Sequence, residues 1–239
     1  MGVERAYFYA HPEQELRDVE WLHYGRYLHE RLKGKPTQYI THRQEFYARE
    51  FRVTPDVLIP RPETELLVEA VLELPARTVI DVGTGSGAIA ITVSLESGAA
   101  VIATDISRAA LQIAGDNARR FGASVPFVAA DLLAPFADSS VDVIVSNPPY
   151  VPEADRASLQ PEVRDWEPGL ALFAGPQGMA IYERLIPEAF RVLRSRGSLV
   201  LEFGFGQADT LSVLIEGWHN PRIRNDLAGI PRVLVCEKP

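Results

Sequence analysis

The chain of 239 residues has a single cysteine, Cys236, and its five histidines show no metal-ligand spacing. An internal disulfide is therefore excluded, and we expect no metal ion. Cys236 belongs to the apolar run 232–236, which we expect to be a buried strand in a reducing cytoplasm. The N-terminus opens no apolar signal sequence and no stretch reaches membrane-spanning length, so the sequence predicts a soluble, cytoplasmic protein with no membrane contact.

Basic residues are also few, because 24 lysines and arginines stand against 32 acids and leave a net charge of −8. This balance disfavours a broad phosphate-binding surface, and with it a direct nucleic acid partner. The sequence lacks the G-x-S-x-G elbow of serine hydrolases and the G-x-x-x-x-G-K phosphate loop. Its length is enough for one substantial α/β core and a small appendage.

The tetrapeptide Asn147-Pro148-Pro149-Tyr150 follows a β-type run over 141–146. The two prolines fix φ near about −65° and lack an N–H, so their carbonyls are not drawn into a continuing strand or helix. Pro148 also biases Asn147 toward extended backbone. A planar NH2 group could donate one N–H to the Asn147 side-chain oxygen and the other to the Pro148 carbonyl, with Tyr150 against its flat face. The alternative is a strand that merely ends in a Pro-Pro turn.

A second motif lies upstream, where the apolar run 78–82 enters a glycine-rich turn and leaves as a helix of small residues. Backbone N–H groups at the start of such a helix face a ligand. The residues that we predict to bind a cofactor here are Asp81, Gly83, Thr84, Gly85, Ser86 and Gly87. Alone the turn is ambiguous, because Gly83-x-Gly85-x-x-Ala88 also satisfies the dinucleotide fingerprint.

Two acids follow the next predicted strands. The strand over 100–105 ends in Asp105, which is placed to accept hydrogen bonds from a ribose diol or, alternatively, to help Ser107 start the next helix. The strand over 125–130 leads to Asp131-Leu132, a further candidate for cofactor binding, with a plain loop acid as the alternative. In a mostly parallel sheet the carboxyl ends of the strands form the ligand-binding edge. The residues predicted to meet there are Gly83, Asp105, Asp131 and Asn147.

Together these motifs resemble the class I S-adenosylmethionine-dependent methyltransferases, and the NPPY segment resembles those that methylate amide or amine nitrogen. The chain is further similar to the HemK-type protein-glutamine methyltransferases, which modify the glutamine of the Gly-Gly-Gln loop in class 1 peptide chain release factors. The stretches that bear this likeness are 34–40, 45–46, 57–65, 162–168 and 172–175. The chain departs from the family in a shorter N-terminal segment and at Thr41-His42, where a glycine is expected after Ile40.

The resemblance implies a class I methyltransferase fold: an α/β, Rossmann-like, mostly parallel seven-stranded sheet with helices on both faces. It also makes Asp131-Leu132 the expected place to meet an adenine amino group and ring. We divide the chain into a helical docking segment over 1–34, a linker over 35–58 in which 38–40 and 45–53 alternate enough to form a β-hairpin, and a methyltransferase domain over 59–239. We also expect helices over 13–33, 110–121 and 182–193, a strand over 198–202, and two strands within 223–237, the second of them reversed.

Two segments keep alternative interpretations. The resemblance makes 61–65 a wall of the cofactor site, whereas Pro62, Glu63 and Glu65 also suit the first turn of a helix. It places the segment 162–167 near the substrate peptide, whereas its composition is also that of a solvated loop.

Three functions remain open at this stage. The leading one is transfer of a methyl group from S-adenosylmethionine to a release-factor glutamine, with Asn147, Pro148 and Tyr150 as the catalytic residues and a monomer as the default state. The second keeps the chemistry but acts on a glutamine of a ribosomal protein or on a nucleobase amine. The stretch between Tyr150 and Gly178 is too short for a separate DNA-recognition domain. The third is a non-catalytic cofactor-binding module on the translation apparatus, which the intact NPPY segment disfavours.

Overall fold

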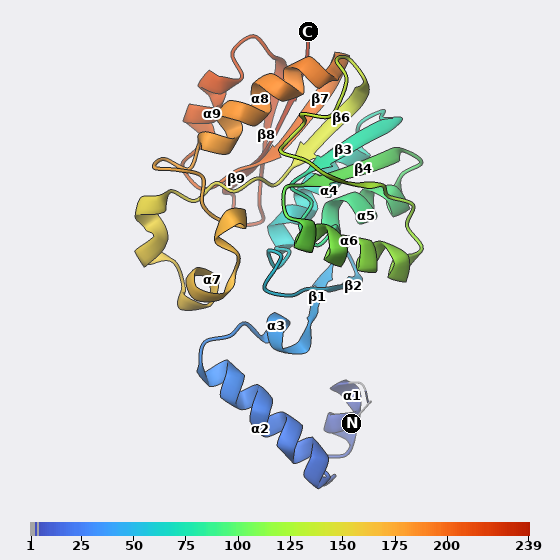
Figure 1. Cartoon of the computed structure of the whole chain (residues 1–239), viewed down its shortest axis with the longest axis vertical. Helices are drawn as coiled ribbons and strands as arrows, with labels where there is room; N and C mark the ends of the chain where they lie inside the picture. The colour runs from blue at the N-terminus through green and yellow to red at the C-terminus, as the bar shows by residue number, and fades with distance from the viewer. Residues whose placement is uncertain (1–2, 4) are drawn as a thin grey trace.

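The computed structural model describes residues 3 and 5–239, and its centre is a seven-stranded sheet (Figure 1). The strands are β3 (Thr78–Val82), β4 (Ala100–Asp105), β5 (Phe127–Ala129), β6 (Val141–Ser146), β7 (Leu193–Glu202), β8 (His219–Asn225) and β9 (Pro231–Glu237). Their order is β5-β4-β3-β6-β7-β9-β8, and β9 runs antiparallel to both of its neighbours. The predicted fold class, with its reversed last strand, is confirmed.

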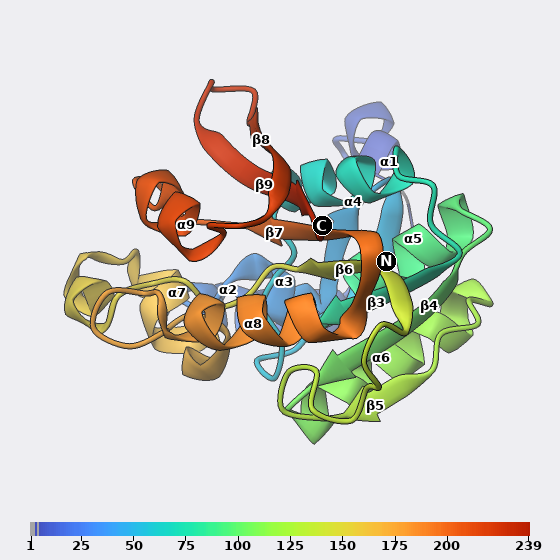
Figure 2. The ribbon, with the colours of Figure 1, turned by 90° about the horizontal axis from the view of Figure 1, so that it is seen from above.

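Helices cover both faces of this sheet (Figure 2). One face packs against α4 (Glu65–Leu72), α5 (Ala88–Glu96) and α6 (Arg108–Phe121), and the other against α8 (Ala180–Val192) and α9 (Ala208–Leu214). Because side chains alternate along a strand, Val79 and Val143 enter the first core cluster while Ile80 and Ile144 enter the second. Strands buried on both faces explain the continuous apolar runs in the sequence.

The strand order reverses direction between β3 and β6. From β3 the chain moves outward through β4 and β5, and it then returns to place β6 on the other side of β3. In open α/β sheets, ligands bind beyond the carboxyl ends of the strands at such a switch point. The loops that follow these strands are therefore the ones that build a site.

The hairpin differs from the prediction at its first segment. Gln38–Ile40 belongs to a short helix, α3 (Thr37–Thr41), and the hairpin is formed by β1 (Arg43–Phe46) and β2 (Arg49–Arg52). The helical turn buries Tyr39 completely and lets its hydroxyl donate to the Val57 carbonyl at 2.6 Å. Helix α3 ends at Thr41, and the residue that caps it, His42, has a left-handed φ of 59°, a conformation that favours glycine. The departure from the family at this point thus falls on a backbone turn.

The N-terminal helices α1 (Arg5–Ala10) and α2 (Asp18–Leu32) extend away from the sheet (Figure 1). The helical segment expected over 13–33 contains the whole of α2, but α2 buries none of its residues, and Trp21 and Leu22 are exposed. An ion pair between Arg31 and Glu162 connects it to α7 (Pro161–Trp166). No helix in the described part of the chain is both long and apolar enough to cross a membrane.

Candidate active site

A cavity of about 230 Å³ opens at the carboxyl ends of β3, β4, β5 and β6. The predicted site residues that line it are Gly83, Gly85, Asp105, Asp131, Leu132, Asn147, Pro148 and Pro149. These residues come from four separate loops, and the parallel sheet brings those loops to one edge.

Gly83 and Gly85 give the cavity a bare backbone surface. Their φ angles are 73° and 55°, in the left-handed region, and a Cβ built on either residue would meet no atom within 4 Å. The turn is fixed because the Gly83 and Thr84 N–H groups both donate to the Thr104 carbonyl at 2.9 Å. A ligand can therefore approach this rigid backbone closely.

Asp81 supports the same turn from behind and does not line the cavity. Its Oδ2 accepts hydrogen bonds from the Thr84 hydroxyl at 2.6 Å and from the Ala90 N–H at 3.2 Å. Complete burial raises the pKa of this carboxyl to about 7, and its Oδ1 has no hydrogen-bond partner within the described residues. Thr84 and Ser86 are buried as well. In this structure the three residues shape the turn without touching the cavity.

Gly87 is the third glycine of the turn and serves packing. Its φ is 82°, and a Cβ there would lie 2.8 Å from Ile91 Cδ1 and 3.1 Å from Ala114 Cβ. Helices α5 and α6 thus approach each other over this residue. It also lies outside the cavity lining.

Asp105 lines the cavity and also makes the contact with Ser107 that its alternative interpretation expects. Its Oδ1 accepts the Ser107 N–H at 2.8 Å, and Ser107 caps α6 by accepting the Ala110 N–H at 3.2 Å. Its Oδ2 accepts the Gly85 N–H at 2.9 Å, which joins the strand end to the glycine turn. Burial raises the pKa of this carboxyl. Each oxygen keeps a further lone pair for a donor in the cavity.

Asp131 and Leu132 form the rim on the β5 side. The Asp131 carboxylate is about half exposed and accepts from Arg184 of α8 at 2.6 Å. Leu132 has a left-handed φ of 50°, and its side chain lines the cavity together with Leu58 and Ile106. This side of the cavity offers apolar walls with a charged pair at its edge.

Asn147 presents its side-chain oxygen as an acceptor, because its Nδ2 donates to the Thr64 hydroxyl oxygen at 3.2 Å. Tyr150, by contrast, does not line the cavity. Its ring packs against the second core cluster and so close to Gly204 that a Cβ there would lie 2.9 Å from Tyr150 Cδ2. Burial raises the pKa of Tyr150 to about 12. The predicted stacking face is thus outside the cavity in this structure.

The segment 61–65 forms no wall of the cavity. Pro62–Thr64 form a 3-10 helix, η1, that leads into α4, as the helix-start interpretation expects. Thr64 lies behind Asn147, a contact that sequence analysis missed. No local spacing could indicate it, since the two residues are 83 positions apart.

The segment 162–167 is only partly a solvated loop. Arg164 and Asp165 pair with each other at the surface, whereas Glu167 is buried and accepts from Arg61 at 2.5 Å and from the Ile59 N–H at 3.3 Å. This contact fastens the end of α7 to the segment before η1. The following residues Pro168, Leu170 and Ala171 line the cavity.

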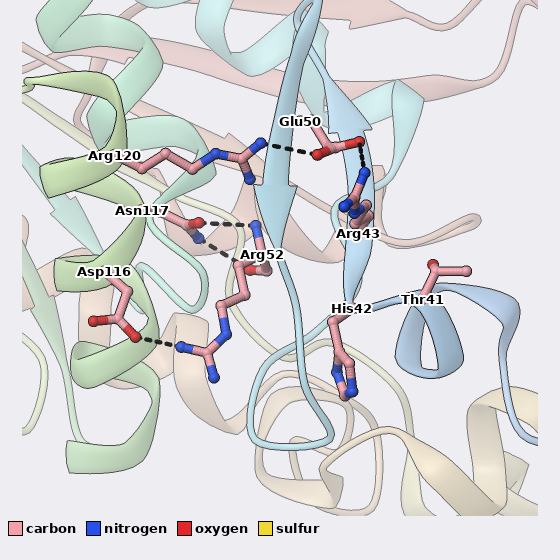
Figure 3. Close-up of a pocket in the computed structure, with 8 residues that line it drawn as sticks. All are labelled: Thr41, His42, Arg43, Glu50, Arg52, Asp116, Asn117 and Arg120. Carbon is pink, nitrogen blue, oxygen red and sulfur yellow. Dashed lines mark hydrogen bonds and ion pairs between the residues drawn. The ribbon is translucent and has the colours of Figure 1, made fainter. Parts of the chain in front are cut away.

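A second, more open hollow of about 390 Å³ lies between the hairpin and α6 (Figure 3). Its arginines point at acids, since Arg43 and Arg120 both bond Glu50 and Arg52 bonds Asp116. These charges largely neutralise one another, and the hollow contains neither the glycine turn nor the NPPY segment. We therefore assign the active site to the first cavity.

Asn117 of α6 lines this hollow and bonds Arg52 of the hairpin (Figure 3), and it also reaches the glycine turn. Its Oδ1 accepts the Arg52 N–H at 2.8 Å, and its Nδ2 donates to the Arg52 carbonyl at 3.0 Å and to the Ser86 carbonyl at 2.9 Å. The side chain is fully buried. It thus holds β2 and the glycine turn in one fixed arrangement.

Comparison with known families and proteins agrees with this geometry. Residues 62–160 match the family model "Methyltransferase small domain", and residues 1–41 match "PrmC N-terminal domain". The chain is 46% identical over 245 residues to the release factor glutamine methyltransferase of Koribacter versatilis (strain Ellin345), an alignment that covers 100% of this chain and 88% of that protein. It is 41% identical over 225 residues to the enzyme of the same name from Bacillus subtilis (strain 168), covering 90% and 78% of the two chains.

Solved structures support the same fold. The Mtq2–Trm112 complex of E. cuniculi, described as responsible for methylation of the eRF1 translation termination factor, matches with a TM-score of 0.54 and 26% identity over 77% of this chain and 99% of that one. The 16S rRNA N2 G1207 methyltransferase of T. thermophilus matches with a TM-score of 0.62 over 82% and 50% of the two chains, and its 20% identity shows the fold alone. On the full-length identities above, the chain belongs to the release factor glutamine methyltransferase family.

Proposed function

We propose that this protein transfers a methyl group from S-adenosylmethionine to the side-chain amide nitrogen of the glutamine in the Gly-Gly-Gln loop of class 1 peptide chain release factors. The observation that carries this proposal is the position of Asn147: it lines the same cavity as the glycine turn and Asp105, and its Nδ2 donates to Thr64, which leaves its oxygen as the acceptor for a substrate N–H. The names of the full-length relatives point to the same reaction.

The residues that line the cavity suit the chemical groups of S-adenosylmethionine. The open space over Gly83 and Gly85 admits the amino-acid part against bare backbone, and Asp105 has lone pairs for the ribose hydroxyls. The apolar walls beside Leu132 suit the adenine ring, with Asp131 at the edge for its amino group. When bound, the sulfonium supplies a strongly electrophilic methyl group.

The amide of the target needs help from the protein, because its nitrogen shares its lone pair with the adjacent carbonyl and is a poor nucleophile. We assign two acceptors to its N–H groups, Asn147 Oδ1 and the Pro148 carbonyl. Two hydrogen bonds orient the nitrogen toward the methyl group and stabilise the positive charge that builds on it during transfer. The proton becomes acidic only as the new bond forms and then leaves to solvent.

The remaining assignments follow from this reaction. We assign residues 1–34 to docking of the release factor, 35–58 to a linker and 59–239 to methyl transfer. The exposed apolar side chains of α2 suit a docking role, since no other part of the described chain covers them. The protein partner places the reaction in the cytoplasm, and the net charge of −8 favours a protein rather than a nucleic acid as substrate. We take the enzyme to act as a monomer.

Transfer of tritium from labelled S-adenosylmethionine tests this function. Release factor, a matched release factor whose loop glutamine is replaced by alanine, and bare RNA or DNA are offered in parallel, with and without nuclease. We expect label in the first substrate alone, at a rate that nuclease does not change. Preferential labelling of nucleic acid would establish the nucleobase function. Label in none of these substrates would leave a ribosomal-protein glutamine as the target, or a binding module without transferase activity.

A further inference from the structure

The buried carboxyl of Glu202 is separated by one residue, Thr64, from the side-chain amide of Asn147, which is proposed to bind the substrate. Ser146 of β6 pairs with Leu201 of β7, so Asn147 and Glu202 follow paired positions on neighbouring strands. Thr64 of η1 lies between them: its oxygen accepts the Asn147 Nδ2–H at 3.2 Å, and its hydroxyl acts on the Glu202 carboxyl as a hydrogen-bond donor that lowers the pKa of that group.

Glu202 is placed unfavourably for a purely structural role. It is 2% exposed and Thr64 is 4% exposed, and the Glu202 Oε2 has no hydrogen-bond partner in the part of the chain that is described. The arginines nearby pair elsewhere, Arg61 with Glu167 and Arg232 with Asp226. Burying a carboxyl with an unsatisfied oxygen lowers the free energy of unfolding. Stability alone therefore does not explain why a glutamate occupies this position.

The single hydroxyl proton of Thr64 lets the Glu202 carboxyl control the orientation of the Asn147 amide. A threonine hydroxyl has one proton to donate. A carboxylate only accepts, so an ionised Glu202 takes that proton and leaves the Thr64 oxygen able only to accept from Asn147. The amide must then turn its NH2 toward Thr64 and its oxygen toward the cavity.

We infer that Glu202 is a positioning residue which, through the Thr64 hydroxyl, holds the Asn147 amide with its oxygen directed at the substrate. The inference rests on the proposed function, in which that oxygen binds the target N–H. Without the carboxylate, the Thr64 proton is free to donate to the Asn147 oxygen, and the amide can rotate to present its NH2 group to the substrate. An NH2 facing another NH2 repels it instead of binding it.

The arrangement makes methyl transfer sensitive to pH. Burial raises the pKa of Glu202 to about 7. The charged and titratable groups that act on it are Arg61, Glu63, Arg232, Tyr150 and Tyr182, and the Tyr182 hydroxyl donates to its backbone carbonyl at 2.7 Å. Because the ionised form positions Asn147, the rate of transfer should fall as the pH drops below about 7.

The kinetic test uses E202Q, which keeps the shape of the side chain but removes its charge, and T64V, which removes the bridging hydroxyl. We expect each to lower kcat about five- to tenfold, the range of a single misdirected hydrogen bond, and to abolish the fall in rate below pH 7. The double variant should be no worse than either single one, because the groups act as one unit. The control is E63Q: the Glu63 charge raises the pKa of Glu202, so its removal should keep the parental rate above pH 7 and move the fall in rate to lower pH.

A second measurement does not depend on methyl transfer. The side-chain amide ¹⁵N–H resonances of Asn147, assigned by their loss in N147A, should shift with the titration of Glu202 in the parent and stay constant in E202Q and T64V. Constant resonances in the parent, or a lower kcat in E202Q with the parental pH profile, would overturn the inference. If the parent labels no release factor, the proposed function fails while the resonances still decide the role of Glu202.

Discussion

Replacing Asn147 with alanine is the sharpest test of the proposed mechanism. The substitution removes the oxygen that is assigned to the target N–H, together with one 3.2 Å hydrogen bond to Thr64. Loss of a preorganised transition-state hydrogen bond lowers turnover about 10²–10³-fold, or about 3–4 kcal/mol. The ground-state loss is smaller, about 1 kcal/mol for one neutral hydrogen bond, because Thr64 keeps its bond to Glu202. Activity should therefore fall far more than stability.

The assay is single-turnover methyl transfer to release factor, with calorimetry of S-adenosylmethionine and urea unfolding on the same preparations. Cofactor affinity should change little, since Gly83, Gly85 and Asp105 are untouched. The N147D variant should have partial activity above that of N147A, because a carboxylate still accepts the N–H although it adds a charge near Glu202. If N147A methylates the release-factor glutamine at near the parental rate, the NPPY segment is only a turn and the mechanism is wrong.

Three further predictions concern the cofactor cavity. Asp105→Ala removes the acceptor for two backbone N–H groups as well as the ribose contact, so we expect calorimetry to show at least tenfold weaker S-adenosylmethionine binding; unchanged affinity would refute the ribose assignment. Gly87→Ala should destabilise the fold by about 2–4 kcal/mol in urea, because a Cβ would clash with Ile91 in a left-handed backbone, whereas Gly85→Ala should lose mainly cofactor affinity; equal stabilities would contradict this contrast. Burial raises the pKa of Asp81 to about 7, so the contribution of this carboxyl to stability is full below about pH 4 and is lost as the pH rises through 7. The free energy of unfolding of the parent should therefore fall across that range relative to Asp81→Asn. A difference between the two proteins that does not change with pH would refute this prediction.

The sheet could be predicted from the sequence because its strands are buried on both faces and therefore read as apolar runs. The runs over 78–82 and 141–146 match β3 and β6 residue for residue. The hairpin was harder, since a short apolar run such as 38–40 does not distinguish a strand from one helical turn. The burial of Tyr39 against Val57, a tertiary contact, decides in favour of the helix.

The site was predictable where a residue ends a strand and faces the cavity, as for Asp105 and Asn147. The residues that contact these two from outside the cavity could not be predicted in the same way. Asp81 was expected to bind the cofactor, but in the structure its carboxyl points into the turn, and only the fold shows which way a strand side chain faces. Thr64 and Glu202 escaped notice because their contacts with Asn147 join distant parts of the chain.

The most direct test of the central claim is mass spectrometry of a class 1 release factor after incubation with the protein and S-adenosylmethionine. The account predicts one added methyl group, located by peptide fragmentation on the side-chain nitrogen of the glutamine in the Gly-Gly-Gln loop, and its absence from a reaction with N147A under the same conditions. An unmodified loop glutamine, or a methyl group at another residue, would contradict it.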